Sequence, residues 1–377
     1  MLRITYYIYP TYTPQRDTSG NLYIKYFHDS FSDEFTVLNK HGQLGIASIF
    51  FNLKADRFIL QWIDLIPFKR LGYLQTLLFV VSLSLLRFLK KDIIWVLHNK
   101  EPHNKTNKTK KQLATWCMDK IASRSALIVT HSTEGIRFLQ HRYPDINPDK
   151  FLYIPHPVYR NKIIPGSRIV WDYIIWGGIS RHKNVAEFLA YVNQSDVLSE
   201  RKILICGKCN DPDYRTEIEK HLTGNICFIN EFLEDQELEK QISRSRCILF
   251  TYNLDSVLSS GALIYSLNFN KLIIGPNGGA FADLRSIVDC YNSFDEIEKI
   301  DPDRKPNFSE IRSYIDHNQW KDLPQKIDRE INKAGGRRRE TGDGRPETGG
   351  RKPETLRCLN ECLMASPFER FDATLLE

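Results

Sequence analysis

The feature that most constrains this chain is an alternation of short runs rich in β-branched and aromatic residues with longer segments of helical pattern. In the first half, the runs that we expect to be strands are residues 3–8, 35–38, 58–63, 92–97, 126–130 and 151–154. Parallel strands need a crossover of about a dozen residues, usually a helix. The alternation therefore predicts a mostly parallel sheet with helices over both faces.

A segment rich in proline and turn-forming residues, 156–167, separates this series from a second one. The second series has expected strands at 171–176, 202–206, 226–229, 247–251 and 272–274, and expected helices at 184–193, 211–221, 235–243 and 261–269. At roughly 100–200 residues per domain, a chain of 377 residues holds about two domains. We therefore expect an α/β protein with two Rossmann-like domains, residues 1–160 and 168–308, that face each other across a cleft.

The C-terminal part changes character near residue 334. Residues 309–333 have a helical pattern that includes Trp320, and then a seven-residue unit follows as ETGDGRP, ETGGRKP and ETLRCLN. The unit lacks the recurring apolar pair of a coiled coil, and glycine and proline interrupt it. We interpret residues 334–377 as a low-complexity, disordered tail with little part in catalysis.

The charge balance argues against binding to nucleic acid. The net charge of +6 comes from 52 basic and 46 acidic residues, but residues 333–357 alone hold eight basic and four acidic residues. The rest of the chain is nearly neutral, so an anion site must come from local clustering and not from a broad field. We expect no nucleic-acid partner.

Residues 71–89 are the longest apolar stretch and leave three alternatives open. The stretch is long enough for a membrane span of ~20 residues. It is interrupted by Gln75 and Arg87, however, and a strand-like run follows at once, as for a buried helix or a helix at a membrane surface. Eight cysteines and an N-terminus without a long apolar signal core indicate a cytoplasmic protein with reduced thiols. The CxxC spacing of Cys206 and Cys209 is interpreted as a strand end, since no second pair accompanies it.

The first cluster of candidate site residues follows the expected strand at 92–97. His98, Asn99, Glu101 and His103 come directly after it, which places two imidazoles and a carboxylate at the carboxyl end of a parallel strand, where ligands bind. A neutral histidine there can transfer a proton or hold a sugar hydroxyl. A purely local hydrogen-bonding role remains the alternative.

Two loops of the second domain have features of anion sites. Gly177 and Gly178 follow a strand and precede Arg181 and Lys183, so the backbone can approach a diphosphate that the cations would bind. The glycine spacing is neither that of GxGxxG nor that of a Walker loop, and a plain strand-to-helix turn is the alternative.

Further along, Ser259, Ser260 and Gly261 lead from a strand into a helix whose free amides suit phosphate. Ordinary capping by serine is the alternative there. The basic segment 100–111 is expected to be a loop that is either solvated or attracts a lipid-linked phosphate or an anionic membrane surface.

Together these segments resemble the family 4-like GT-B glycosyltransferases over most of residues 1–333. WVLHNKEPH looks like the histidine loop of that group, GGISRHKN like its donor-phosphate loop, and SSGALIYSLNFNKLIIGPNGG like its nucleotide-sugar loop and the following helix. Trp320 lies in what resembles the C-terminal helix that crosses back to the first domain.

The resemblance implies roles for the candidate residues. Arg181 and Lys183 would stabilise the diphosphate leaving group, and His98 would position the transferred sugar, with Glu101 and His103 as its catalytic neighbours. Gly177, Gly178, Ser259, Ser260 and Gly261 would complete the donor site, and Asn21 and Asn99 would contact the acceptor. Two departures stand out: the family's arginine is Gly178 here, and residues 257–265 lack the Glu-x7-Glu pair.

These inferences predict a transferase that moves a sugar from a nucleotide diphosphate sugar to a glycan or lipid-linked acceptor in surface polysaccharide assembly. Retention of anomeric configuration is implied by the resemblance alone. No metal or redox cofactor is expected, and a place on the inner membrane surface is an open alternative to a purely cytoplasmic one. The alternative function is a noncatalytic GT-B-like subunit that binds a glycan or a partner.

Overall fold

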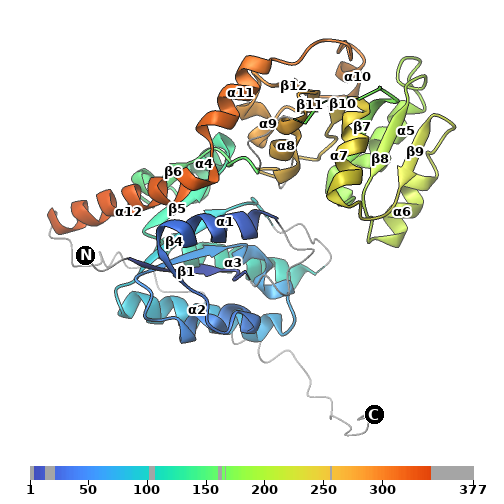
Figure 1. Cartoon of the computed structure of the whole chain (residues 1–377). Coiled ribbons are helices and arrows are strands. Elements are labelled where there is room, and N and C mark those ends of the chain that lie inside the picture. Colours follow the sequence, from blue (N-terminus) through green and yellow to red (C-terminus); the bar gives the residue numbers. More distant parts are fainter. Residues whose placement is uncertain are drawn as a thin grey trace, which may run out of the picture. The chain divides into compact units, whose positions relative to one another are not determined.

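The structure is a computed structural model that describes residues 4–12, 22–101, 107–159, 164–165, 167–254 and 257–340, with residues 334–340 as backbone only. Residues 1–334 form one compact unit. Figure 1 shows the chain and its elements.

The first sheet has six parallel strands in the order β2-β1-β3-β4-β5-β6. The strands are β1 (Thr5–Tyr9), β2 (Thr36–Leu38), β3 (Arg57–Gln61), β4 (Asp92–Leu97), β5 (Leu127–Thr130) and β6 (Phe151–Tyr153). The helices among them are α1 (Leu22–Glu34), η1 (Gly42–Phe51), η2 (Ile63–Phe68), α2 (Gly72–Phe88), α3 (Lys108–Arg124), α4 (Thr133–Arg142) and η3 (Pro148–Lys150).

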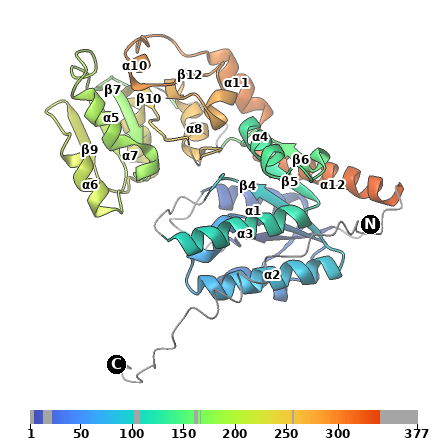
Figure 2. The same cartoon turned by 180° about the vertical axis from the view of Figure 1, so that it is seen from behind.

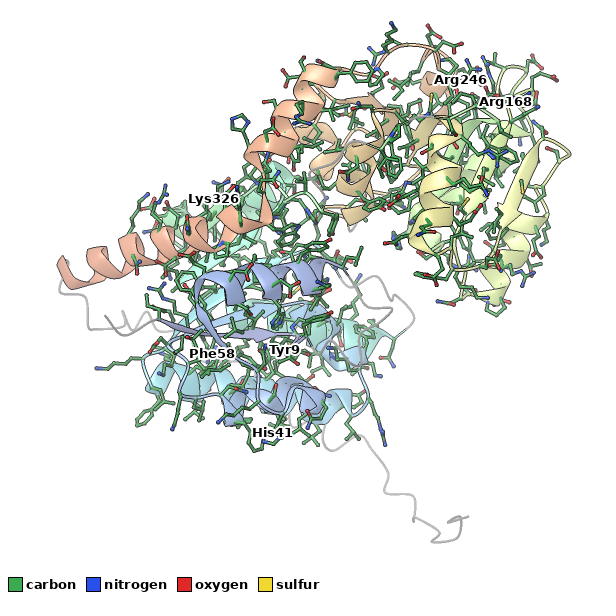
Figure 3. The ribbon with its side chains drawn as sticks, in the orientation of Figure 1. Tyr9, His41, Phe58, Arg168, Arg246 and Lys326 are labelled. Atoms are coloured by element: carbon green, nitrogen blue, oxygen red, sulfur yellow. The ribbon has the colours of Figure 1, made fainter. Side chains whose placement is uncertain are left out.

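Helices cover both faces of this sheet because successive residues of each strand point to opposite faces. Tyr6 and Ile8 of β1 belong to the buried cluster that includes Phe27 of α1. Tyr9 and Phe58 belong to the cluster on the other face, with side chains of α2, α3 and α4. Figure 3 shows Tyr9 and Phe58 between the sheet and α2, and Figure 2 shows the same layers from behind.

The second sheet also has six parallel strands, in the order β12-β11-β10-β7-β8-β9. They are β7 (Trp171–Trp176), β8 (Ile203–Cys206), β9 (Ile226–Ile229), β10 (Ser245–Leu249), β11 (Leu272–Pro276) and β12 (Val288–Tyr291). The helices are η4 (Arg181–Lys183), α5 (Val185–Val192), α6 (Pro212–Glu219), α7 (Asp235–Ser243), α8 (Gly261–Ser266), η5 (Leu267–Phe269), α9 (Gly279–Asp283) and α10 (Phe294–Ile297). The sequence missed β12, whose half-buried Asp289 and Cys290 break the apolar pattern.

The last elements of the described part of the chain are α11 (Phe308–His317), η6 (Trp320–Asp322) and α12 (Leu323–Glu340). Trp320 packs on the ring of Tyr23 in α1, with 5.1 Å between ring centroids. Asp328 of α12 forms an ion pair with Arg57 of β3. The expected start of the tail at residue 334 stays a prediction: α12 continues to Glu340, the compact unit ends at residue 334, and residues 341–377 lie outside the described residues.

Two parallel sheets flanked by helices confirm the expected two-domain α/β fold class. The apolar stretch 71–89 forms α2, which has 17 residues and buries Phe79, Leu83 and Leu86. Among the described residues we find no helix with both the length and the apolar character that a membrane span requires. The expected basic loop 100–111 is partly helical, because Asn107 caps the start of α3 through the backbone N–H of Lys110.

Candidate functional site

His98 lies at the carboxyl end of β4 and is buried, with 8% of its surface exposed. Its ring stacks on Trp62 with 4.0 Å between centroids, and its Nε2 lies 3.0 Å from Oε1 of Gln61, the last residue of β3. Burial holds the pKa of His98 well below its ordinary value. The imidazole is therefore neutral near pH 7 and can donate or accept a hydrogen bond.

Two further histidines follow the next two strands of the first sheet. His131 Nε2 lies 2.7 Å from the hydroxyl of Tyr23 and its Nδ1 lies 2.7 Å from the carbonyl oxygen of Ile154. His156 Nδ1 lies 2.8 Å from the carbonyl oxygen of Pro157. Burial lowers the pKa of His131 to about 4 and that of His156 to about 3.

The ring of Tyr23 contacts His98, His131 and His156, so the three histidines form one neutral cluster. We did not predict His131 or His156. The available signal was a histidine one or two residues after each of three successive expected strands.

Two buried donors in this cluster have no hydrogen-bond partner in the described part of the chain. They are Nε2 of Gln61, which is fully buried, and Nε1 of Trp320. An unpaired buried N–H costs free energy until an oxygen reaches it. Neutral imidazoles and free N–H donors suit a ligand rich in hydroxyl groups better than a charged one.

Two other predicted residues of this loop, Asn99 and Glu101, have partners other than His98. The Glu101 side chain is half-exposed and its Oε2 lies 2.6 Å from Nζ of Lys111, so it is taken up by a surface ion pair. Asn99 is buried, forms a β-bridge with Val257 and donates from Nδ2 to Asp64 Oδ2 at 3.5 Å.

Burial raises the pKa of Asp64 to about 6, which makes this carboxyl a titratable group that the sequence did not reveal. Two predicted residues, His103 and Asn21, lie outside the described residues.

The ammonium group of Lys183 lies at the carboxyl end of β7 in the second sheet. Only 5% of the residue is exposed, and its Nζ donates to the carbonyl oxygen of Trp176 at 2.7 Å, where β7 ends. Nζ also lies 5.4 Å from the centre of the Tyr252 ring. An ideal Cβ on Gly177, whose φ is +91°, would lie 2.9 Å from Nζ, so the glycine loop closes directly over the ammonium. Gly178 faces open space.

The prediction joined Arg181 to Lys183 at one diphosphate, but the structure separates them. Arg181 is half-exposed and binds Asp211 at 3.0 Å and Glu217 at 2.8 and 2.9 Å, with its guanidinium over the Tyr214 ring. Both residues lie on η4, whose tight turn directs the two side chains to different neighbours. The guanidinium of Arg181 is therefore bound to Asp211 and Glu217 and does not share the partners of Lys183.

Ser260 caps α8 and lies near the same tyrosine as Lys183. Its Oγ accepts from the Leu263 N–H at 3.2 Å and donates to the Tyr252 hydroxyl at 3.4 Å. Gly261 packs against Tyr159, whose hydroxyl would lie 2.7 Å from a Cβ on this residue. At the start of α8, Ser260 is buried, whereas Ser259, Gly261 and Ala262 are half-buried.

Tyr252 contacts both Lys183 and Ser260, and it was missed. Its only sequence signal is an aromatic residue directly after the expected strand 247–251.

Comparison of the sequence with protein-family models and with curated proteins finds no match. Solved structures do match. Anabaena Alr3699/HepE in complex with UDP-glucose has a TM-score of 0.64 at 10% identity, over 88% of this chain and 100% of that chain. The UDP-forming α,α-trehalose-phosphate synthase from Burkholderia vietnamiensis has a TM-score of 0.54 at 11% identity, over 84% of this chain and 82% of that chain. TarM has a TM-score of 0.54 at 10% identity, over 75% of this chain and 57% of that chain.

These likenesses concern the architecture, because sequence identity is near one residue in ten. The chain has the GT-B fold, the two-domain α/β architecture of the glycosyltransferases among these structures. This result confirms the fold that the sequence motifs suggested.

Proposed function

We propose that the protein is a glycosyltransferase that moves a sugar from a nucleotide diphosphate sugar to a glycan or lipid-linked saccharide. The HepE structures hold UDP or UDP-glucose, and the trehalose-phosphate synthase is named as UDP-forming, so a UDP-sugar is the first donor to test. The finer parts of the proposal are retention of configuration, a role in surface polysaccharide assembly, and work at the cytoplasmic face of a membrane.

The observation that carries the proposal is the position of Lys183. Transfer from a nucleotide diphosphate sugar leaves negative charge on the departing diphosphate, and a preorganised cation lowers the barrier most where that charge develops. Lys183 Nζ is fixed by the Trp176 carbonyl beneath the Gly177 backbone, at the carboxyl end of β7. Ligands bind at such strand ends in open α/β sheets. In this proposal Lys183 supplies the charge stabilisation, and no metal or redox cofactor takes part.

In this proposal the histidine cluster binds the transferred sugar and the acceptor through hydrogen bonds. His98 is neutral, and its Nε2 donates to Oε1 of Gln61, so Nδ1 is the ring nitrogen that can accept from a sugar hydroxyl without adding charge. Gln61 Nε2 and Trp320 Nε1 are the nearby donors without a partner in the described residues. We assign positioning of the transferred sugar to His98, and we leave Glu101 out because Lys111 already binds it.

Calorimetric titration with UDP, UDP-glucose and a panel of other nucleotide sugars tests the proposal. We expect Lys183→Met, which keeps the side-chain length and removes the charge, to weaken binding at least about tenfold. The matched control is Lys208→Met, since Lys208 is exposed on the loop after β8. The thermal melting of both variants is measured first. Absence of binding to every donor by the folded parent chain would refute the proposal.

A second candidate is the noncatalytic GT-B-like subunit that binds a glycan or a partner. It is favoured by Arg181 and Glu101, since both predicted site residues form ion pairs elsewhere. Single-turnover assays separate the candidates, because a noncatalytic subunit would give no transfer and no donor hydrolysis even with bound donor. In that case the Lys183→Met variant would leave glycan assembly in cells unchanged.

A further inference from the structure

Exposed apolar side chains gather on one helix of the first domain. Fourteen large apolar residues are exposed in the described part of the chain, and seven of them lie between residues 71 and 89. These seven are Leu71, Tyr73, Leu74, Leu77, Val81, Phe88 and Leu89. Leu77 is 58% exposed and Phe88 is 81% exposed. Scattered exposed leucines are normal, but a concentration of this kind marks an interaction surface.

The exposed residues form a stripe along α2. Leu74, Leu77, Val81 and Phe88 recur at the three- and four-residue steps that bring side chains to one helix face, with Ser84 completing the series. From residue 74 to residue 88 the stripe extends for about 21 Å at 1.5 Å per residue. The opposite side of α2 is buried against the sheet through Phe79, Leu83 and Leu86, so α2 is apolar on both sides.

The neighbouring segment η1 adds to this surface. Its Ile46 N–H donates to Oε1 of Gln75 in α2 at 3.2 Å, so the two elements pack together. Leu44 and Phe51 of η1 are exposed, and the Phe51 ring lies 4.6 Å from that of His41. Figure 3 shows His41 on the outer side of the α2 layer, away from the sheet.

Positive charge lies at both ends of the stripe. Arg70 is exposed just before α2, Arg87 is in its last turn, and Lys90 and Lys91 follow it. No acidic residue occurs from position 65 to position 91. An apolar helix face with cations at its ends and no carboxylate between them matches the acyl boundary and the anionic headgroups of a lipid bilayer.

We propose that the outer face of α2, together with η1, is the surface by which this protein docks on an anionic lipid bilayer, with α2 lying in the plane of the interface. The inference deepens the proposed function, on which it rests for the lipid-linked nature of the acceptor. The bilayer would hold the first domain where a lipid-linked saccharide is available.

The charges favour a bilayer over a second copy of the chain. A twofold contact places the same surface on both partners. Along α2, such a contact would bring Arg70 of one copy near Arg87, Lys90 and Lys91 of the other, or each cation near its own equivalent. Positive charges would face each other in both arrangements, whereas the anionic headgroups of a bilayer can pair with all four of these basic side chains.

Vesicle flotation of the full chain tests the docking surface. We expect the protein to bind vesicles of phosphatidylcholine with 30% phosphatidylglycerol and to bind phosphatidylcholine alone at least about tenfold more weakly. Phe88→Glu should reduce binding to the mixed vesicles at least about tenfold. The matched control is Phe308→Glu, an exposed phenylalanine at the start of α11, which should bind as the parent does.

Three results would overturn the inference. The parent chain could fail to bind the mixed vesicles, or the Phe88→Glu variant could bind them as the parent does. Sedimentation could also show a dimer in lipid-free buffer that Phe88→Glu disperses, in which case a second copy covers α2. UDP binding is measured in the same lipid-free buffer. If the protein binds vesicles but no nucleotide, the result contradicts the proposed function and leaves the docking surface intact.

Discussion

Gly207 lies where two backbone segments approach more closely than a side chain would permit. An ideal Cβ on this residue would lie 2.1 Å from the carbonyl oxygen of Gly177, and its φ is +146°. The flanking Cys206 and Cys209 are free thiols. At the scale of single residues, the glycine of this Cys-Gly-Lys-Cys segment is what allows β8 to end directly beside the loop that covers Lys183.

His131 connects burial at one residue to the pH dependence of stability. Its pKa falls from an ordinary 6.5 to about 4 in the folded chain. Between these values the unfolded chain binds a proton that the folded chain does not, so the free energy of unfolding falls as the pH falls. In His131→Gln we expect this slope to be smaller by up to about 1.4 kcal/mol per pH unit.

Urea unfolding at a series of pH values from 7 to 4 measures the slope for His131→Gln. The control is His141→Gln, since His141 is exposed on α4 and should leave the slope as in the parent. Equal slopes for the parent and His131→Gln would contradict the expectation. Asp64, with its raised pKa, acts in the opposite sense but is the same in all three chains.

Among the elements, α4 and α9 stabilise each other's ends although they follow different sheets. Asp283 of α9 accepts from the Thr133 N–H at 2.8 Å and from the Thr133 hydroxyl. In return, Glu134 of α4 accepts from the Gly279 N–H at 2.5 Å, where α9 begins, and pairs with Lys100. Carboxylates are stabilising at helix N-termini, where backbone N–H groups lack partners.

Asp283→Ala removes both hydrogen bonds to Thr133. We expect the free energy of unfolding in urea to fall by about 1–2 kcal/mol. Asp316→Ala is the control, since Asp316 pairs with Arg312 on the exposed side of α11 and should cost less than about 0.5 kcal/mol. Equal effects of the two substitutions would show that the contact between α4 and α9 contributes nothing beyond a surface ion pair.

At the scale of the whole molecule, α12 near the end of the described chain packs against β1 and β3 of the first sheet. Arg57 of β3 is buried and binds Asp328 and Asn332 of α12, and Tyr6 also donates to Asp328 at 2.9 Å. The two partners of the ion pair are 271 positions apart in the chain. This contact therefore fixes the position of α12 against the first sheet.

Asp328→Ala leaves the buried Arg57 guanidinium without its main partner. We expect a loss of about 3 kcal/mol in the free energy of unfolding, because an uncompensated buried charge costs more than a lost surface pair. Glu330→Ala on the same helix is the control, since Glu330 pairs with Lys333 in solvent. A loss below 1 kcal/mol for Asp328→Ala, with unchanged cooperativity, would mean that Arg57 finds another partner or water.

The sequence predicted eleven of the strands because each is a short apolar run bounded by turn formers, a pattern that depends on neighbours along the chain. It also placed Lys183 and His98 at strand ends, where parallel topology directs ligands. It could not predict which of the two cations is buried, because Arg181 and Lys183 are only two positions apart in the same loop. The difference comes from Asp211, which caps α6, and Glu217, which lies on α6, since both bind Arg181 at the surface.

The local pattern of this sequence by itself determined the two parallel sheets, the glycine loop after β7 and the apolar character of α2, since these follow from spacing and side-chain type. Tertiary structure alone decided that His98, His131 and His156 meet around Tyr23, that Tyr159 covers Gly261, and that one face of α2 stays uncovered. The reason is physical: burial, pKa and partner choice depend on atoms that are distant along the chain and adjacent only after folding.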